Sequence, residues 1–405
     1  MTDATANNGH LEGIRVLDFS ALIAGPSCGK YMSDHGAEVI KLERYPNGDI
    51  SRHSFGATGN GRGPMFLQQN AGKKSLCVDL KHPDGIALVC ELIPHIDVVI
   101  EAFTPGVMQR LGLGYDALRA INDRIIVCSV SGFGQTGPNA KRPGYAHIAH
   151  AMTGWLGMQF LHREPPEPPR GPGIAIGDTT AGLTAFGAVC AALFKRERAG
   201  TGEHIDIALF DALFGSNDVA LQHALLLDEP NELDVWYHPV HATLDGFVTA
   251  NVGPDYRAWE NVCAAMDKTA LLDDTRFNCA QAVRENAHAA TAIVSRWLAT
   301  LTSEDAELTL TKHHIACGIV RTVPEAIDQP QVHDRGLRVT VQDPVLGSID
   351  VVNSAFKYRN AQSGVRGPAP TLGQHNREIL DDLLGYAPDK IDALEADGVL
   401  TKASG

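Results

Sequence analysis

The chain has 405 residues, a formal net charge of −14, and a composition of 44% hydrophobic and 20% charged residues. This length predicts two domains or one large elaborated domain, and the acidic balance argues against a general nucleic-acid-binding protein. The eight Cys residues form no C-x-x-C pair, so we expect no metal site and no disulfides, as in a reducing cytoplasm. The sequence shows neither a signal-peptide pattern nor 18 uninterrupted apolar residues. We therefore expect a soluble cytoplasmic protein without membrane contact.

Short apolar runs alternate with helix-like segments in the first half of the chain. In chain order the sequence predicts strands at Arg15–Phe19, Glu38–Leu42, Ser75–Leu80, Asp97–Ile100 and Ile125–Ser129, with helices at Ser27–His35, 82–93 and Tyr115–Ile121. A helix over 178–196 and a sixth strand at His204–Ala208 follow. Near-continuous apolar strands alternating with helices predict a parallel sheet covered on both faces, in a doubly wound, Rossmann-like layer of the α/β class.

The common nucleotide-binding loops are absent from the sequence. No G-x-G-x-x-G follows a predicted strand, and the glycines of 59–63 stand in a loop with no helix pattern after it. A P-loop motif is absent as well. We therefore exclude a dinucleotide site of the usual kind.

The chain changes character from about Asp228. A strand at Phe247–Asn251 and helices at Tyr256–Met266, Ala280–Leu301 and Ser303–His313 predict a smaller α+β domain. The tail returns to strands at Val339–Val341 and Ile349–Asn353 and ends in an amphipathic helix through Ile379–Leu384. We expect a large domain formed by 10–225 with 325–405 and a small domain over 228–322.

One carboxylate stands out at the start of the long helix predicted after the first five strands. A Pro/Gly-rich segment, 164–173, predicts a stiff connector that leads to Asp178. Asp is a preferred helix N-cap, and the helix dipole with its free N–H groups favours an ionised carboxylate. Gly177 predicts open space beside the carboxylate, and Gly182 predicts a close backbone approach. Asp178 is thus expected to cap the helix, and it is at the same time a candidate carboxylate nucleophile.

Eight stretches in a fixed order carry a family resemblance. They are Leu11–Phe19 with Ala24–Pro26, Gly36–Arg44, Asn70–Leu76, Ser129–Pro138, Arg142–Tyr145, Gly177–Asp178, Gly200–Gly202 and Leu372–His375. Together they resemble the family III (CaiB/BaiF-type) CoA-transferases over nearly the whole chain. The resemblance implies two domains per chain and an interlocked homodimer, in which each chain threads a hole in its partner.

The resemblance also implies roles for individual residues. The family's aspartate nucleophile matches Asp178, and Ala24 would line the entry for pantetheine. The other family positions that contact CoA match Arg44, Val78, Lys81, Phe103, Arg110 and Leu111. Lys73 and Lys74 are further candidates to reach a phosphate.

The acyl pocket is expected around Tyr145, His147 and Gly177. Sequence relatives that racemise α-methylacyl-CoA carry a catalytic His after the Arg-x-Gly element, where this chain has Tyr145. They also use a small-domain Glu, roughly where this chain has residues 253–255. Both departures weaken the racemase interpretation.

We therefore expect an acyl-CoA:carboxylate CoA-transferase that works through an aspartyl–CoA thioester at Asp178. We expect an acyl-CoA such as succinyl-CoA as the donor and a small carboxylic acid as the acceptor. Because each step exchanges an acyl group between oxygen and sulfur, neither a metal nor a tightly bound cofactor is needed, and coenzyme A enters as substrate. The alternatives are an α-methylacyl-CoA racemase or epimerase on the same fold, and a CoA-binding protein without catalysis.

Overall fold

The computed structural model describes residues 9–402, except 55, 57–58, 159–167, 172, 227–238 and 252–255. It divides the chain into two units. Unit 1 comprises Met1–Asn217 with His333–Gly405, and unit 2 comprises Asp218–Val332. The domain limits expected from the sequence stay a prediction. Residues 253–255 and most of the Pro/Gly-rich connector lie outside the described residues.

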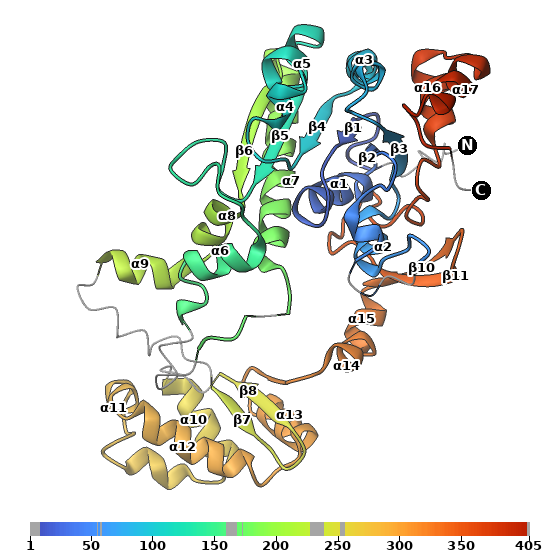
Figure 1. Ribbon diagram of the computed structural model, residues 1–405. Helices are drawn as coiled ribbons and strands as arrows, with labels where there is room; N and C mark the ends of the chain where they lie inside the picture. The colour runs from blue at the N-terminus through green and yellow to red at the C-terminus, as the bar shows by residue number, and fades with distance from the viewer. Residues whose placement is uncertain are drawn as a thin grey trace, which may run out of the picture. The chain divides into compact units, whose positions relative to one another are not determined.

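Unit 1 is built on a six-stranded sheet in which every pairing is parallel. Its strand order is β3-β2-β1-β4-β5-β6, which Figure 1 shows across the upper part of the view. The strands are β1 Arg15–Asp18, β2 Glu38–Arg44, β3 Lys74–Val78, β4 Val98–Glu101, β5 Ile126–Ser131 and β6 Glu203–Ala208. The α/β class and the parallel sheet predicted from the sequence are confirmed.

Helices cover both faces of this sheet, because alternate residues of each strand point to opposite sides. On one face Leu17 and Val99 pack with residues of α3, α5, α16 and α17; on the other, Val16 and Val98 pack with residues of α1, α7 and α8. The helices of unit 1 are α1 Ala24–Asp34, α2 Pro64–Asn70, α3 Pro83–Leu92, α4 Val107–Arg110, α5 Tyr115–Ile121, α6 Ala146–Met152, α7 Ile176–Ala199, α8 Leu209–Gly215, α16 Asn376–Leu384 and α17 Pro388–Ala396.

The tail of the chain completes unit 1. Strands β10 Arg338–Asp343 and β11 Gly347–Val352 form an antiparallel pair. Beyond them, side chains of the C-terminal segment bond to the outer edge of β3: the Ser75 N–H donates to His375 Nδ1 at 3.1 Å and the Cys77 N–H donates to Asn376 Oδ1 at 2.9 Å. Backbone groups on an edge strand need such partners when buried.

Unit 2 is a small α+β unit. Its antiparallel sheet has the order β7-β8-β9, formed by Val240–Ala242, Phe247–Ala250 and Cys317–Ile319. The helices α10 Tyr256–Ala265, α11 Ala280–Glu285, α12 Ala287–Leu298 and α13 Ser303–Lys312 contribute to one core, with Trp259 and Val294 at its centre. The shorter helices are α9 Asp218–Leu226, α14 Val323–Ile327 and α15 Pro330–Asp334, which ends in unit 1.

Several boundaries differ from those predicted. The single helix expected over Ala280–Leu301 is two helices, since the backbone leaves helical geometry at Asn286, whose φ is −113° and ψ is 27°. The helices α2, α6 and α8 were not predicted; each is seven residues long, so its helical period is weak, although α5 of the same length was predicted.

By length and composition α7 is long and apolar enough to cross a membrane, alone among the helices in the described part of the chain. Its apolar side chains have another explanation. Ala181, Ala185 and Val189 are fully buried in the core that α7 forms with β5 and β6. The apolar character of α7 is therefore that of a helix packed on a sheet.

Candidate active site

Asp178 is the third residue of α7, not its cap. The helix begins at Ile176, and the capping position is held by Ala175, whose side chain makes no capping bond. The prediction that Asp178 caps the helix is therefore wrong. The physical reason lies in α6: the Gly177 N–H, one of the orphan donors of the first turn, donates to Nε2 of the buried His150 at 3.1 Å. A side-chain cap from Asp178 is not needed there.

The Asp178 carboxylate has no hydrogen-bond or ion-pair partner among the described residues. Burial alone raises the pKa of Asp178 to about 6. The helix terminus was expected to favour the ionised form, which would lower this pKa, but burial shifts it in the opposite direction. With a pKa near 6 about nine in ten such carboxylates are still ionised at pH 7, and the higher basicity makes the anion a better nucleophile.

Two glycines bring neighbouring helices against the first turns of α7. A Cβ on Gly177 would lie 3.4 Å from Ala146 Cα and 3.6 Å from Ala149 Cβ, so this residue faces α6 and not the open space that was expected. A Cβ on Gly182 would lie 2.7 Å from the Ala24 carbonyl oxygen, which confirms the predicted close approach, here of α1. Because four helical residues rise about 6 Å, Ala24 is held one turn beyond Asp178.

The residues expected in the acyl pocket have different surroundings. Gly177 is buried against α6, whereas Tyr145 and His147 are exposed, with Tyr145 at 57%. The Tyr145 and His147 rings stack on each other with centroids 6.0 Å apart and an interplanar angle of 5°. Both side chains are therefore accessible at the start of α6, the helix that packs against the Asp178 turn.

A cavity of about 410 Å³ opens at the carboxyl ends of β1, β2 and β3. Of the seven residues expected to contact CoA, it brings together five: Arg44, Val78, Lys81, Phe103 and Leu111. Ala24 and Arg110 are not among the lining residues. Ala24 is the first residue of α1 and follows the lining residue Ala21 by three positions. Arg110 is the exposed last residue of α4, next to the lining residue Leu111. In a sheet of this order, ligands bind outside the strand ends where the winding direction reverses, here between β1 and β4.

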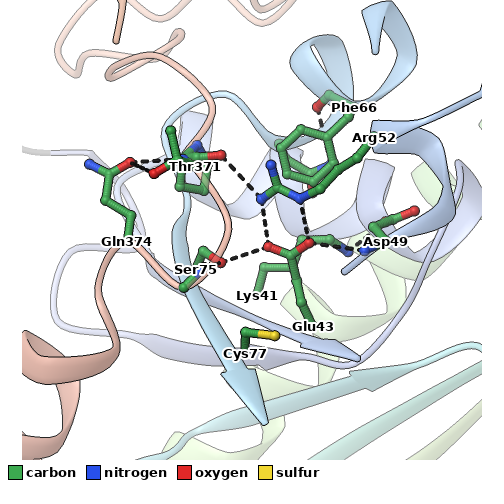
Figure 2. A network of polar contacts seen from close by, with 12 residues as sticks. Lys41, Glu43, Asp49, Arg52, Phe66, Ser75, Cys77, Thr371 and Gln374 are labelled. Atoms are coloured by element: carbon green, nitrogen blue, oxygen red, sulfur yellow. Dashed lines mark hydrogen bonds and ion pairs between the residues drawn. The ribbon is translucent and has the colours of Figure 1, made fainter. Parts of the chain in front are cut away.

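Ionic groups form the inner wall of this cavity. Lys41 Nζ donates to the Ser20 carbonyl at 2.6 Å and lies 3.0 Å from Asp49 Oδ2. Figure 2 shows the neighbouring part, in which Glu43 is held between Arg52 and Ser75. Lys41, Glu43 and Asp49 all line the cavity and are buried, so its base is polar and held in place by ion pairs and hydrogen bonds.

The two other lysines considered for phosphate binding are engaged elsewhere. Lys73 is fully buried and its Nζ lies 2.8 Å from Asp18 Oδ2, which makes it part of the core. Lys74 pairs with Glu38 and Glu378, each at 2.7 Å. A phosphate therefore cannot reach Lys73, and neither lysine lines the cavity. Within the described residues no group of His, Cys, Asp or Glu is arranged to hold a metal ion.

Known proteins match this chain over almost its whole length. A family model described as CoA-transferase family III matches residues 11–376. The chain belongs to this family. It is therefore a CoA-transferase, and the resemblance seen in the sequence motifs is confirmed.

Individual family III relatives agree with that assignment. The succinyl-CoA–D-citramalate CoA-transferase of Chloroflexus aurantiacus is 33% identical over 399 residues, covering 96% of this chain and 98% of that protein. The succinyl-CoA:glutarate CoA-transferase of Mus musculus is 32% identical over 405 residues, covering 96% of this chain and 90% of that protein. The crystal structure of a CAIB/BAIF family protein from Brucella suis superposes with a TM-score of 0.81 at 30% identity, covering 93% of this chain and all of that one.

Some residues of this family III site were not predicted. Lys41 could have been recognised, because it is a lone lysine in the apolar strand Glu38–Leu42, and a buried charge needs a partner. Asp49 gave no such signal, because it stands in a loop. For His150 the sequence indicated a place near the expected acyl pocket, but its bond to the Gly177 N–H is made only in the folded chain.

Proposed function

We propose that this family III CoA-transferase moves CoA from succinyl-CoA to a small dicarboxylic acid, with Asp178 as the nucleophile. The observation that carries the proposal is the unpaired, half-buried carboxylate of Asp178 in the first turn of α7. A structural carboxylate at this depth is normally hydrogen-bonded or paired. An unpaired one with a raised pKa is typical of a functional group.

The reaction needs only acyl exchange between oxygen and sulfur. The Asp178 carboxylate attacks the thioester carbonyl of the donor, the C–S bond breaks, and a mixed anhydride and CoA thiolate result. The thiolate attacks the aspartyl carbonyl, the C–O bond of the anhydride breaks, and the donor acid leaves behind an aspartyl–CoA thioester. The acceptor carboxylate reverses these steps and restores the Asp178 carboxylate. No electron or proton is gained or lost overall.

The cavity at the strand ends suits the nucleotide part of CoA. Arg44 and Lys81 stand exposed at its rim, where their charges favour phosphate groups. Val78, Phe103 and Leu111 supply the apolar surface that an adenine ring needs. Ala24 follows the lining residue Ala21 by three residues and contacts Gly182, one turn from Asp178, so α1 links this cavity to the Asp178 turn, and we place the pantetheine arm along it.

The choice of donor and acceptor rests on the relatives. The two relatives described above are named for succinyl-CoA as donor, with citramalate and glutarate as their other substrates. We extend that substrate class to this chain. We further propose an interlocked homodimer in the cytoplasm, as the family resemblance implies.

The test is to trap the covalent intermediate. The protein is incubated with succinyl-CoA, treated with hydroxylamine or borohydride, and digested for mass spectrometry. A mass change on the peptide that contains Asp178 is expected, and Asp178→Ala should abolish both the adduct and transfer to glutarate while the protein stays folded. Asp211→Ala is the matched control, because burial also raises the pKa of this carboxyl, which lies in α8.

Two results would overturn the proposal. Retained transfer in Asp178→Ala removes Asp178 as the nucleophile. Exchange of the α-proton of a 2-methylacyl-CoA with solvent deuterium, without any adduct, identifies a racemase in place of a transferase.

A further inference from the structure

His150 lies in the last turn of α6 with only 2% of its surface exposed. Its ring packs beside Trp155, with centroids 5.2 Å apart. Nε2 faces the first turn of α7 and accepts the Gly177 N–H at 3.1 Å. A nitrogen that accepts this bond carries no proton, so the ring is neutral with its proton on Nδ1.

The same contact fixes the residue that precedes the proposed nucleophile. Gly177 is buried with α6 directly against it, since a Cβ at this position would touch Ala146 and Ala149. Its N–H donates to a third α6 residue, His150. Three residues on one face of α6, namely Ala146, Ala149 and His150, therefore contact the first turn of α7. Asp178 is the next residue along the chain. Its carboxylate has no partner of its own, so its position depends on the backbone that carries it.

We propose that His150 is a positioning residue of the transferase: by accepting the Gly177 N–H, it fixes the peptide before Asp178 and aims the free carboxylate at the thioester carbonyl. This inference rests on the proposed role of Asp178. His150 touches neither substrate nor the reacting atoms, and it acts through the α7 backbone.

The side chain at position 150 has to accept the Gly177 N–H without carrying a charge. A carboxylate at position 150 would satisfy the N–H, but its charge would disfavour the ionised form of Asp178. A cation would have no lone pair for the N–H and would pair with Asp178, which would then be a weaker nucleophile. Burial and the nearby His147 lower the pKa of His150 and keep the imidazole neutral. The contact is thereby satisfied without a charge beside the nucleophile.

The experiment compares His150→Gln with His150→Asn in the full-length protein. Both variants carry an amide, but only the longer Gln side chain reaches Gly177 N–H with its oxygen. The rate and the half-saturation concentration of adduct formation are measured by rapid quench with succinyl-CoA and intact-protein mass. We expect His150→Asn to lower the maximal rate about 10- to 100-fold, because a small misplacement of a reacting group has this effect. The half-saturation concentration should change less than about threefold, and His150→Gln should restore the rate to within about threefold.

The matched control is His375→Leu. His375 also accepts a backbone N–H, that of Ser75 at 3.1 Å, but it lies in the C-terminal segment and is not among the residues that line the proposed CoA cavity. Its loss should lower the melting temperature without changing the rate per folded molecule. If His150→Asn does not fold, His150→Met replaces it, because Met fills similar volume without an equivalent acceptor.

Four outcomes separate the hypotheses. A folded His150→Asn as fast as the unsubstituted protein overturns the positioning role, and so does a folded His150→Gln as slow as His150→Asn. An adduct that forms normally in Asp178→Asn overturns the proposed nucleophile instead, whatever the position-150 variants do. A rate that falls in His150→Asn, returns in His150→Gln and is unchanged in His375→Leu supports the inference.

Discussion

Arg52 meets Glu43 through two hydrogen bonds: Nε donates to Oε2 at 2.7 Å, and Nη2 donates to Oε1 at 2.6 Å (Figure 2). Both side chains are buried. Arg52 also lies over the Phe66 ring, with its guanidinium carbon 3.6 Å from the centroid, and Nη2 donates to the Pro370 carbonyl at 3.1 Å. Because Glu43 lines the cavity, this pair joins the base of the proposed CoA site to the C-terminal segment.

Breaking that pair should destabilise unit 1 strongly. Arg52→Met leaves Glu43 as a buried, largely unpaired charge, and losses of about 3–5 kcal/mol are usual in this situation. We expect urea unfolding to show a loss of this size, together with a raised KM for succinyl-CoA. The control is Lys195→Met, which breaks an exposed pair with Glu203 and should change the unfolding free energy little. A loss for Arg52→Met no larger than that of the control would contradict the prediction.

Asp178→Asn should make the protein more stable while it abolishes transfer. Burial raises the folded-state pKa from 3.8 to about 6, so ionisation at higher pH is penalised only in the folded state. The shift corresponds to at most about 3 kcal/mol, and partial exposure reduces it to about 1–2 kcal/mol. The gain in unfolding free energy should be present at pH 8, shrink as the pH falls below about 6, and vanish below 3.8. A gain that is independent of pH would contradict this origin.

The pH dependence of the reaction should report the same carboxyl. Only the ionised form of Asp178 attacks the thioester, so kcat/KM for succinyl-CoA should fall as the pH drops through about 6. The pH dependence of kcat/KM reports the pKa values of the free enzyme. The control is Asp211→Asn, which removes another carboxyl whose pKa is raised by burial, and the inflection should persist in it. An inflection near 4 would mean that burial does not act on Asp178 as described.

The cations at the cavity rim should matter only for the phosphates of CoA. Removing one charge in Arg44→Ala or Lys81→Ala should raise KM for succinyl-CoA about 10-fold with little change in kcat, as for a charge-assisted phosphate contact. KM is also measured with succinyl-3′-dephospho-CoA, which lacks the 3′-phosphate. The variant that has lost the cation contacting this phosphate should no longer prefer succinyl-CoA over the dephospho substrate. Lys312→Ala, in α13 of unit 2, is the control and should change neither constant. An unchanged KM in both rim variants would remove this cavity as the CoA site.

The hydrogen bonds that Asn376 makes at the edge of β3 should contribute measurably to the free energy of unfolding. Asn376 accepts the Cys77 N–H at 2.9 Å and donates through Nδ2 to the Thr401 carbonyl at 2.7 Å, and it is almost completely buried. Asn376→Ala should therefore cost about 1–3 kcal/mol in urea unfolding, because the backbone groups are left unpaired. Amide exchange at Cys77 should accelerate with it. Gln281→Ala, which removes an exposed bond to Glu285, should stay within about 0.5 kcal/mol.

The sequence by itself determined the class of fold and the family. Six apolar runs such as Glu38–Leu42 predicted the parallel sheet, since strands buried on both faces must be apolar along their length. The order of motifs indicated a family III CoA-transferase, and the glycine at 182 correctly predicted a close helix approach. These features are local patterns, and local patterns are readable without knowing what packs against them.

Only the tertiary structure decided how the site is built. The sequence predicted that Asp178 caps α7 and is held ionised by the helix, but in the folded chain His150 takes the Gly177 N–H and burial raises the pKa of Asp178. Lys73 resembled a phosphate ligand in the sequence and is paired with Asp18 in the core. In both cases the prediction failed because of a partner that is distant in the sequence: His150 for Gly177, and Asp18 for Lys73. Desolvation and ion pairing depend on the atoms brought around a group by folding, and residue order alone does not specify them.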